Sequence, residues 1–201
     1  MLTIVLQAGG KSSRMGKDKG LAPFLGQPLV ERLRDRFHNL NSEMLIICND
    51  FSGYEYLGLP LHGDIIPDRG ALGGLLTALT IAKTPYVGLI AVDMPFASST
   101  LLIYLLEQIQ RSGADAILPS TQNGLEPLHG VYKRSTCLAF VREAIEEDRW
   151  RMTAWHQRAR IEILDPDKTR TIAGSEHTFF NLNTPEDLSA AEELAVRNQQ
   201  S

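Results

Sequence analysis

The fold and a first candidate site are indicated by residues 3–19, TIVLQAGGKSSRMGKDK. The opening run Thr3-Ile4-Val5-Leu6 is apolar and short, which is typical of a buried strand. A glycine-rich segment follows it and carries four cations, Lys11, Arg14, Lys17 and Lys19. Backbone N–H groups of such a segment can approach phosphate oxygens, while lysine and arginine neutralise the phosphate charge. The stretch predicts a strand followed by a phosphate-binding loop, with a solvated surface turn as the alternative.

This loop differs from the two commonest phosphate-binding motifs. It contains neither the Gly-x-x-x-x-Gly-Lys-Ser/Thr pattern of ATPases nor the Gly-x-Gly-x-x-Gly pattern of dinucleotide-binding proteins. Both of those functions therefore lose support. The position of the loop directly after a buried strand still favours phosphate binding, because ligands of α/β folds bind at the carboxyl ends of strands.

Short apolar runs alternate with segments of helical period along the rest of the chain. The expected strands are 3–6, 44–48, 86–92, 114–118, 128–132, 160–164 and 178–180. The expected helices are 28–40, 72–83, 98–109, 135–147, 152–158 and one that opens at Thr184-Pro185. This alternation predicts an α/β fold, a single-domain Rossmann-like three-layer sandwich with a mainly parallel, mixed sheet. We expect one domain over residues 1–197 and a frayed tail over 198–201.

The composition excludes several classes of protein. Twenty Lys and Arg against twenty-four Asp and Glu give a net charge of −4, which disfavours a basic surface for nucleic acid or anionic lipid. No segment has the pattern of a signal peptide or membrane span. Cys48 and Cys137 lie far apart and form no zinc motif, so each is expected to be buried in a reducing compartment. These features predict a cytoplasmic protein that binds neither nucleic acid nor membrane.

Polar residues follow several of the expected strands. Asp93 ends an apolar run, where a carboxylate is placed to bind a hard cation or to cap a turn. Asn49 follows another run, and its amide could pair with a nucleobase edge or close a turn. Residues 68–74, DRGALGG, form a second glycine-rich segment, suited either to a base or ribose or to a plain helix start. A lone His129 is expected to be structural, and Trp150 and Trp155 are expected to pack between helices.

Residues 8–19 resemble the A-G-G-x-S-x-R-M-G-x-x-K signature of the molybdenum cofactor guanylyltransferases. The resemblance extends through Asn49, the segment 68–74, Asp93-Met94-Pro95, residues 127–129 and Asn181-Leu182-Asn183-Thr184-Pro185. It thus covers almost the whole chain and implies a sheet of the nucleotide-diphospho-sugar transferase type. Two positions depart from the family pattern, because Ala71 replaces a proline and Gln7 replaces an apolar residue.

The resemblance implies a role for individual residues. Arg14 and Lys19 would stabilise a triphosphate, and Asp93 would bind both Mg²⁺ and the nucleotide phosphates. The implied nucleotide-binding set also includes Gln7, Ala8, Gly9, Gly10, Asn49 and Asp68. Asn181 and Asn183 lie near the acceptor pterin in the resembling enzymes, although a structural turn also explains them. Residues 1–95 would form the nucleotide side and residues 96–197 the acceptor side.

The leading hypothesis is transfer of GMP from GTP to the terminal phosphate of molybdopterin, with release of pyrophosphate. Other cofactor-biosynthesis proteins or recipient molybdoenzymes would be its protein partners. Ala8-Gly9-Gly10 favours guanine over cytosine, since the cytidylyl relatives commonly have Ala-Ala-Gly at these positions. A molybdenum cofactor cytidylyltransferase, a sugar-1-phosphate nucleotidyltransferase and a non-catalytic nucleotide-binding protein are the alternatives.

Overall fold

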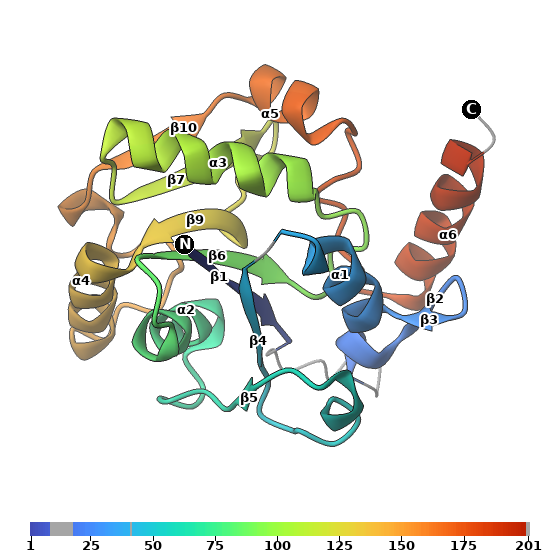
Figure 1. Ribbon diagram of the computed structural model, residues 1–201, viewed down its shortest axis with the longest axis horizontal. Coiled ribbons are helices and arrows are strands. Elements are labelled where there is room, and N and C mark those ends of the chain that lie inside the picture. The colour runs from blue at the N-terminus through green and yellow to red at the C-terminus, as the bar shows by residue number, and fades with distance from the viewer. Residues whose placement is uncertain (9–17, 41, 200–201) are drawn as a thin grey trace.

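The computed structural model describes residues 1–8, 18–40 and 42–199 (Figure 1). The main sheet has the strand order β10-β7-β9-β6-β1-β4-β5, with β8 paired to β7. Its strands are β1 (Leu2–Gln7), β4 (Glu43–Ile47), β5 (Leu61–His62), β6 (Tyr86–Ala91), β7 (Ala116–Thr121), β8 (Gly124–Leu125), β9 (His129–Lys133) and β10 (Ile161–Leu164). Strand β9 runs antiparallel to both of its neighbours, and the other pairs along this path are parallel. The predicted mixed, mainly parallel sheet is confirmed.

Helices cover both faces of this sheet (Figure 1). The helices are α1 (Leu29–His38), α2 (Gly70–Ile81), α3 (Ser99–Ser112), α4 (Arg134–Glu146), α5 (Pro166–Ala173) and α6 (Pro185–Gln199). Alternate residues of β1 point to opposite faces, so Ile4 and Leu6 pack with α1 and α3 while Val5 packs with α2 and α4. The three-layer sandwich follows from this alternation, because each face of the sheet buries its own apolar cluster.

A third apolar cluster lies outside the two faces of the sheet. It joins Phe24 and Leu29, from the start of the chain, to Leu182, Ala191 and Ala195 from its end. Phe24 belongs to a hairpin of two short strands, β2 (Pro23–Phe24) and β3 (Gln27–Pro28). The Leu25 amide also donates a hydrogen bond to Glu192 Oε1 over 2.7 Å. The last helix is therefore fixed to the segment that follows Lys19.

Two expected elements are absent from the structure. Residues 178–180 form turns rather than a strand, since the Phe180 amide bonds back to the His177 carbonyl and Thr178 Oγ1 bonds to the Ser175 carbonyl. Residues 152–158 form turns and a 3₁₀ helix, η3 (His156–Arg158), because their amides bond to carbonyls three residues earlier. In both segments individual side chains are buried without the repeat of a regular element.

Some smaller predictions have mixed outcomes. Cys48 and Cys137 are free and buried, as expected. Trp155 is fully buried, whereas Trp150 is 46% exposed and stacks on the Arg69 guanidinium, so the prediction that it packs between helices is wrong. Helix α6 continues to Gln199, past the expected start of the frayed tail, and residues 200–201 lie outside the described residues.

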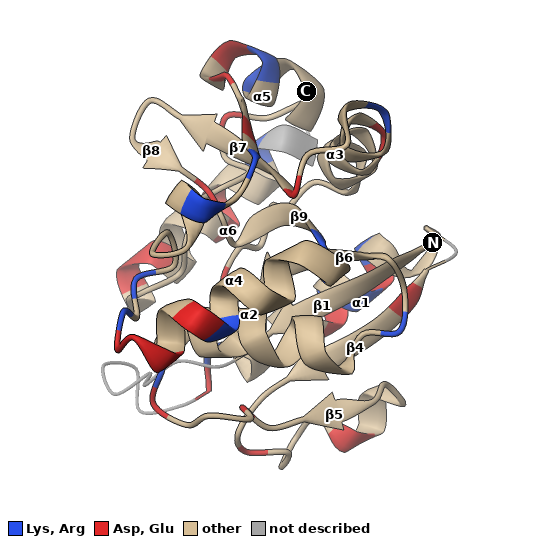
Figure 2. Cartoon of the chain, turned by 90° about the vertical axis from the view of Figure 1, so that its left-hand side faces the viewer, with Lys and Arg blue, Asp and Glu red and all other residues tan. Residues whose placement is uncertain are grey.

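The surface carries charges of both signs. Figure 2 shows Lys and Arg interspersed with Asp and Glu along the helices and loops of one side of the molecule. None of the described helices is long and apolar enough to cross a membrane.

Candidate active site

The candidate site lies at the edge of the sheet where β1, β4, β6 and β7 end. These strands run in the same direction, so the turns that follow them meet along one edge. Open α/β sheets bind their ligands at this edge. Three of the residues singled out from the sequence come together here.

Lys19 is the centre of this group. Its ammonium donates a hydrogen bond to Asn183 Oδ1 over 2.7 Å and forms an ion pair with Asp93 Oδ2 at 3.3 Å. Lys19 opens the short helix η1 (Lys19–Leu21), Asp93 follows β6, and Asn183 precedes α6. The Lys19 and Asp93 side chains are 22% and 23% exposed, which leaves them accessible to a ligand. Lys19 and Asp93, which the resemblance assigns to the triphosphate, thus lie together, and Asn183 joins them.

Backbone contacts hold the turn of Asp93 in place. The Asp93 carbonyl accepts a hydrogen bond from the amide of Leu182, a buried residue of the third apolar cluster, over 2.9 Å. On the opposite side, the guanidinium of Arg36 in α1 donates to the carbonyls of Pro95 and Ala97 at 2.7 and 3.0 Å. Burial lowers the pKa of Arg36, and the nearby cation Arg32 adds to that effect.

His129 supports the far end of the same turn. Its Nε2 accepts a hydrogen bond from the Ser98 amide over 3.0 Å, and Ser98 in turn caps α3. The ring is fully buried, and burial lowers the pKa of His129 to about 4. The neutral imidazole is therefore structural, as the sequence predicted.

The Gln7 side chain occupies the space left by a glycine of α2. A Cβ atom at Gly74 would lie 2.0 Å from Gln7 Nε2, so only glycine fits beside this glutamine. Gln7 Nε2 donates to the Ala71 carbonyl at 3.4 Å, and Gln7 Oε1 has no partner among the described residues. The Gln7 carbonyl accepts a hydrogen bond from the Val92 amide, and the Ala8 amide donates one to the Ile47 carbonyl. This packing explains the polar residue at a position where the family has an apolar one.

Asn49 follows β4, and Asp68 lies between β5 and α2. Asn49 forms two hydrogen bonds with Asp64, donating from Nδ2 to Oδ2 and accepting at Oδ1 from the amide, both over 2.9 Å. Asp68 is exposed in the turn before α2, with a backbone φ of 61°. Asp64 was not predicted from the sequence, because its partner lies 15 residues away and no local pattern marks it.

Among the remaining predicted residues, three are not described and Asn181 makes a local contact. Gly9, Gly10 and Arg14 lie outside the described residues. Asn181 donates from its amide to the Phe179 carbonyl over 3.2 Å, which is a local turn contact. The turn explanation therefore accounts for the Asn181 contact, while Asn183 participates in the Lys19 group.

The oxygen donors of the Lys19 group fit a magnesium ion. A carboxylate oxygen of Asp93 and the amide oxygen of Asn183 both face the Lys19 ammonium. Mg²⁺ prefers oxygen ligands of these kinds. Among residues 1–8, 18–40 and 42–199, no cluster of three or more His, Cys, Asp or Glu side chains could hold a metal. The donor set therefore suits an ion that takes its other ligands from substrate phosphates and water rather than an all-protein metal site.

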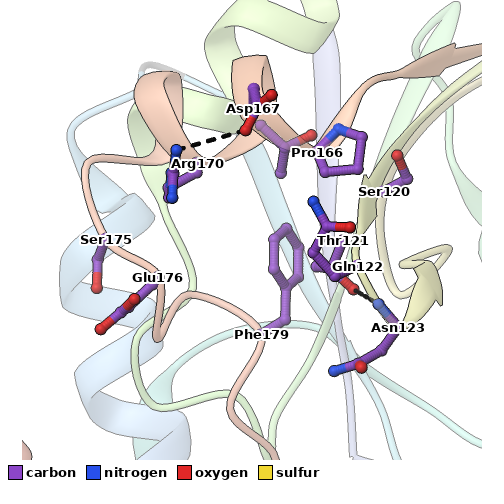
Figure 3. Close-up of a pocket in the computed structure, with 11 residues that line it drawn as sticks. Ser120, Thr121, Gln122, Asn123, Pro166, Asp167, Arg170, Ser175, Glu176 and Phe179 are labelled. Atoms are coloured by element: carbon purple, nitrogen blue, oxygen red, sulfur yellow. Dashed lines mark hydrogen bonds and ion pairs between the residues drawn. The ribbon is translucent and has the colours of Figure 1, made fainter.

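A cavity of about 240 Å³ lies farther along this edge (Figure 3). Its walls come from the end of β7, the turn into β8, the first turns of α5 and residues 175–179. The Phe179 ring stands between Gln122 and Asn123 on one wall and Ser175 and Glu176 on the other (Figure 3). The cavity thus combines one aromatic ring with several hydrogen-bonding groups.

Residues 4–160 match the family model described as the MobA-like NTP transferase domain. The match covers most of the chain, including the strands that position Asp93. This chain is a MobA-like nucleotidyltransferase. The expectation of a nucleotidyltransferase from the glycine loop and the strand-end aspartate is confirmed at the level of the family.

Individual relatives of this MobA-like transferase agree with that assignment. A probable molybdenum cofactor guanylyltransferase of Natronomonas pharaonis is 33% identical over 199 residues, covering 95% of this chain and 96% of the relative. The crystal structure of molybdopterin-guanine dinucleotide biosynthesis protein A from Archaeoglobus fulgidus is 25% identical, with a TM-score of 0.83 over 98% of this chain and 100% of that one.

A more distant structure shares the fold alone. The 4-diphosphocytidyl-2C-methyl-D-erythritol synthase of Anaerococcus prevotii is 9% identical, with a TM-score of 0.74 over 97% of this chain and 96% of that one. The nucleotidyltransferase architecture predicted from the sequence is therefore confirmed, and its sheet is shared with an enzyme whose name indicates another acceptor.

Proposed function

We propose that this MobA-like transferase moves GMP from GTP to the terminal phosphate of molybdopterin and releases pyrophosphate. An oxygen of the acceptor phosphate attacks the α-phosphorus of GTP, and the bond from that phosphorus to the bridging oxygen of the pyrophosphate breaks. The contact that carries the proposal is Lys19 between Asp93 and Asn183. The names of the full-length relatives support the choice of guanine and of the molybdenum cofactor.

The site supplies positioning and charge for this reaction. The attacking phosphate is already anionic at neutral pH, so the step needs neutralised phosphate charge more than a proton acceptor. Lys19 provides a positive charge at the sheet edge, and before substrate binds it neutralises Asp93. His129 is unsuited to act as a base, because it is buried and its Nε2 accepts from the Ser98 amide. Arg14 would add a second cation from the glycine loop.

Mg²⁺ would be held by Asp93 and Asn183 in this proposal. When bound, the ion neutralises phosphate charge and orients the triphosphate. The chain itself fixes the two oxygen donors, Asp93 through the turn held by Arg36 and Asn183 through its neighbour Leu182. The backbone around Ala8, Gly9 and Gly10, together with Asn49 and Asp68, would bind the nucleotide.

We assign the acceptor pterin to the cavity beside Phe179. The ring offers a stacking surface, and Gln122 and Asn123 offer amide groups to the polar edges of a heterocycle. Phe179 is four residues from Asn183, a span of at most roughly 14 Å for an extended chain. A ring in the cavity and a phosphate near Lys19 thus fit the two ends of one acceptor. The nucleotide side would then comprise residues 1–95 and the acceptor side residues 96–197.

The test is release of pyrophosphate by the purified protein with Mg²⁺. We expect release from GTP only when molybdopterin is also present, and much slower release from CTP at the same concentration. Preference for CTP would indicate a cytidylyltransferase acting on the same acceptor. GTP binding without release in the presence of molybdopterin would contradict transfer and indicate a nucleotide-binding protein.

The acceptor assignment is tested separately with Phe179→Ala. Loss of a stacking ring should raise the KM for molybdopterin by about tenfold, given that stacking and burial of such a ring contribute roughly 1–1.5 kcal/mol. The KM for GTP should stay within twofold of wild type. An unchanged KM for molybdopterin would place the pterin elsewhere.

A further inference from the structure

Tyr54 is a fully buried residue that contacts the segment carrying Lys19. It lies just before the short helix η2 (Glu55–Leu57), and its hydroxyl donates a hydrogen bond of 2.6 Å to Asp18 Oδ1. The same oxygen of Asp18 accepts a second hydrogen bond, from the Gly20 amide, over 2.9 Å. The residues on both sides of Lys19 are thus tied to one carboxylate oxygen, and Tyr54 ties that oxygen to the core.

The packing around Gly20 is independent evidence that the Tyr54 hydroxyl lies close against this segment. A Cβ atom on Gly20 would lie 2.4 Å from the Tyr54 hydroxyl oxygen, and the next nearest atoms, Tyr54 Cζ and Val92 Cγ2, are each 3.3 Å away. Gly20 does not have a positive φ, so lack of space rather than backbone conformation accounts for the glycine here. The hydroxyl therefore fills the position where a side chain at residue 20 would begin.

These contacts also restrict the partners of Lys19. Asp18 is the neighbour of Lys19 in sequence and carries another carboxylate. Its Oδ1 is held by the Tyr54 hydroxyl and the Gly20 amide, while the Lys19 ammonium pairs with Asp93 and Asn183. Burial, and then the hydrogen bond to Asp18, raise the pKa of Tyr54 far above its usual value, so the phenol remains a donor at working pH.

We propose that Tyr54 is a positioning residue, which acts through Asp18 to direct Lys19 toward Asp93 and Asn183. The proposal rests on the proposed function in that Lys19 is taken to stabilise the triphosphate. Tyr54 itself touches neither substrate. Its effect should appear in the rate of transfer and in the chemical environment of Lys19, and should leave the acceptor side unchanged.

The main variant is Tyr54→Phe, which removes one oxygen atom and keeps the buried ring. Tyr56→Phe is the matched control, because Tyr56 lies two residues away and is 56% exposed. We expect kcat for GMP transfer to fall about tenfold in Tyr54→Phe, as for loss of a hydrogen bond to a charged group. The KM for molybdopterin and the rate of the control should stay within twofold of wild type, at a temperature where circular dichroism shows each variant folded.

A second measurement needs no substrate. The rate of Lys19 acetylation by acetic anhydride, followed by mass spectrometry, should rise at least threefold in Tyr54→Phe because the ammonium is no longer held in its ion pair. Lys168, whose side chain is 67% exposed, serves as the internal standard and should react at the wild-type rate. A merely structural role of Tyr54 would leave the reactivity of Lys19 unchanged in the folded variant.

Gly20→Ala supplies a test of the fit. In the wild-type background the added methyl meets the phenol oxygen at 2.4 Å, whereas in Tyr54→Phe that oxygen is gone and the nearest atoms, of the ring and of Val92, are 3.3 Å away. The loss of kcat caused by Gly20→Ala should therefore be several-fold smaller in the Tyr54→Phe background. Equal losses in both backgrounds would contradict the proposed contact.

The outcomes separate the two proposals. An inactive wild-type protein with GTP and molybdopterin would overturn the proposed function, and Lys19 acetylation would still report on Tyr54. An active wild type together with a Tyr54→Phe variant of unchanged kcat and unchanged Lys19 reactivity would overturn the positioning role alone.

Discussion

The ends of β6 and β4 present polar side chains at the same edge of the sheet, yet they are held in different ways. Asp93 after β6 is paired with Lys19, 74 residues away, and its turn is bound by segments from α1 and from the chain before α6. Asn49 after β4 is bonded to Asp64, only 15 residues away. Long-range contacts thus assemble a charged centre, formed by Lys19, Asp93 and Asn183, at the end of β6. At the end of β4, a contact within one loop holds Asn49.

The comparison predicts different kinetic roles for the two ends. Groups that meet at the charged centre should act on the transition state and change kcat. Asn49, at the end of β4, lies at the edge of the site. Its amide should therefore act on binding of the nucleotide and change KM.

The largest effect is expected at the charged centre. Lys19→Ala and Asp93→Ala should each lower kcat by about 10²–10³-fold, because removal of one preorganised charged contact typically costs roughly 3–4 kcal/mol of transition-state stabilisation. Lys168→Ala is the matched control and should leave kcat unchanged. Steady-state pyrophosphate release measures all three variants, and near-normal turnover by both site variants would remove the basis for the assignment.

The second effect is a pH dependence of stability caused by His129, at the end of the turn that follows Asp93. The pKa of His129 is about 4 in the folded protein and near 6.5 in the unfolded chain, so the unfolded chain binds more protons between these values. The contribution of His129 to stability is present above pH 6.5 and is lost as the pH falls toward 4. The loss should amount to about 2 kcal/mol between pH 7 and pH 5.

His129→Gln isolates this contribution. The glutamine carbonyl can accept the Ser98 hydrogen bond without titrating, so the variant should lose less stability than wild type between pH 7 and pH 5. Urea unfolding of both proteins at pH 7 and pH 5 gives the loss of stability of each. The difference between the two losses cancels the contribution of the carboxylates, which both proteins share. Equal losses in wild type and variant would show that His129 titrates normally.

A smaller effect is expected where α1 supports the same turn. Arg36→Met removes the donors to the Pro95 and Ala97 carbonyls while keeping a long, half-buried side chain, and it should lower kcat about tenfold. Arg111→Met is the control, since that side chain is 73% exposed. A loss of thermal stability with unchanged kcat would show that the turn keeps its position without Arg36.

The smallest effect is expected at the end of β4. Asn49→Ala should raise the KM for GTP by about fivefold, the loss of roughly one neutral hydrogen bond, while kcat stays within twofold. Asp64→Ala should have a similar effect through loss of its two bonds to Asn49. A large fall in kcat for either variant would end the distinction between the two strand ends.

The sequence was sufficient for the features that depend on local pattern. Apolar runs identified the strands around Asp93 and Asn49, and the Thr184-Pro185 signature located the start of α6, where Thr184 and Asp187 exchange hydrogen bonds. Asp93 was predicted because a carboxylate after a buried strand is chemically distinctive, whereas Lys19 was selected from the four cations of the glycine loop by the family resemblance.

The features that the sequence did not reveal depend on contacts between distant segments. Nothing near Asn49 indicates Asp64, and nothing near Lys19 indicates that Tyr54 holds its neighbour Asp18. Residues 178–180 look like a strand because Phe179 and Phe180 are apolar. Their half-buried rings pack separately, Phe179 against His129 and Phe180 on the third cluster, and this segment does not pair with the sheet.

The bond between the Asp93 carbonyl and the Leu182 amide has a consequence for synthesis on the ribosome. The last strand of the sheet ends at Leu164, so a growing chain can complete all three layers around the sheet before Leu182 and Asn183 have emerged. Lys19 then lacks one of its two partners, and the Asp93 turn lacks the segment that closes over it. The Lys19 group is therefore completed after the segments that form the scaffold, when Leu182 and Asn183 reach the turn of Asp93.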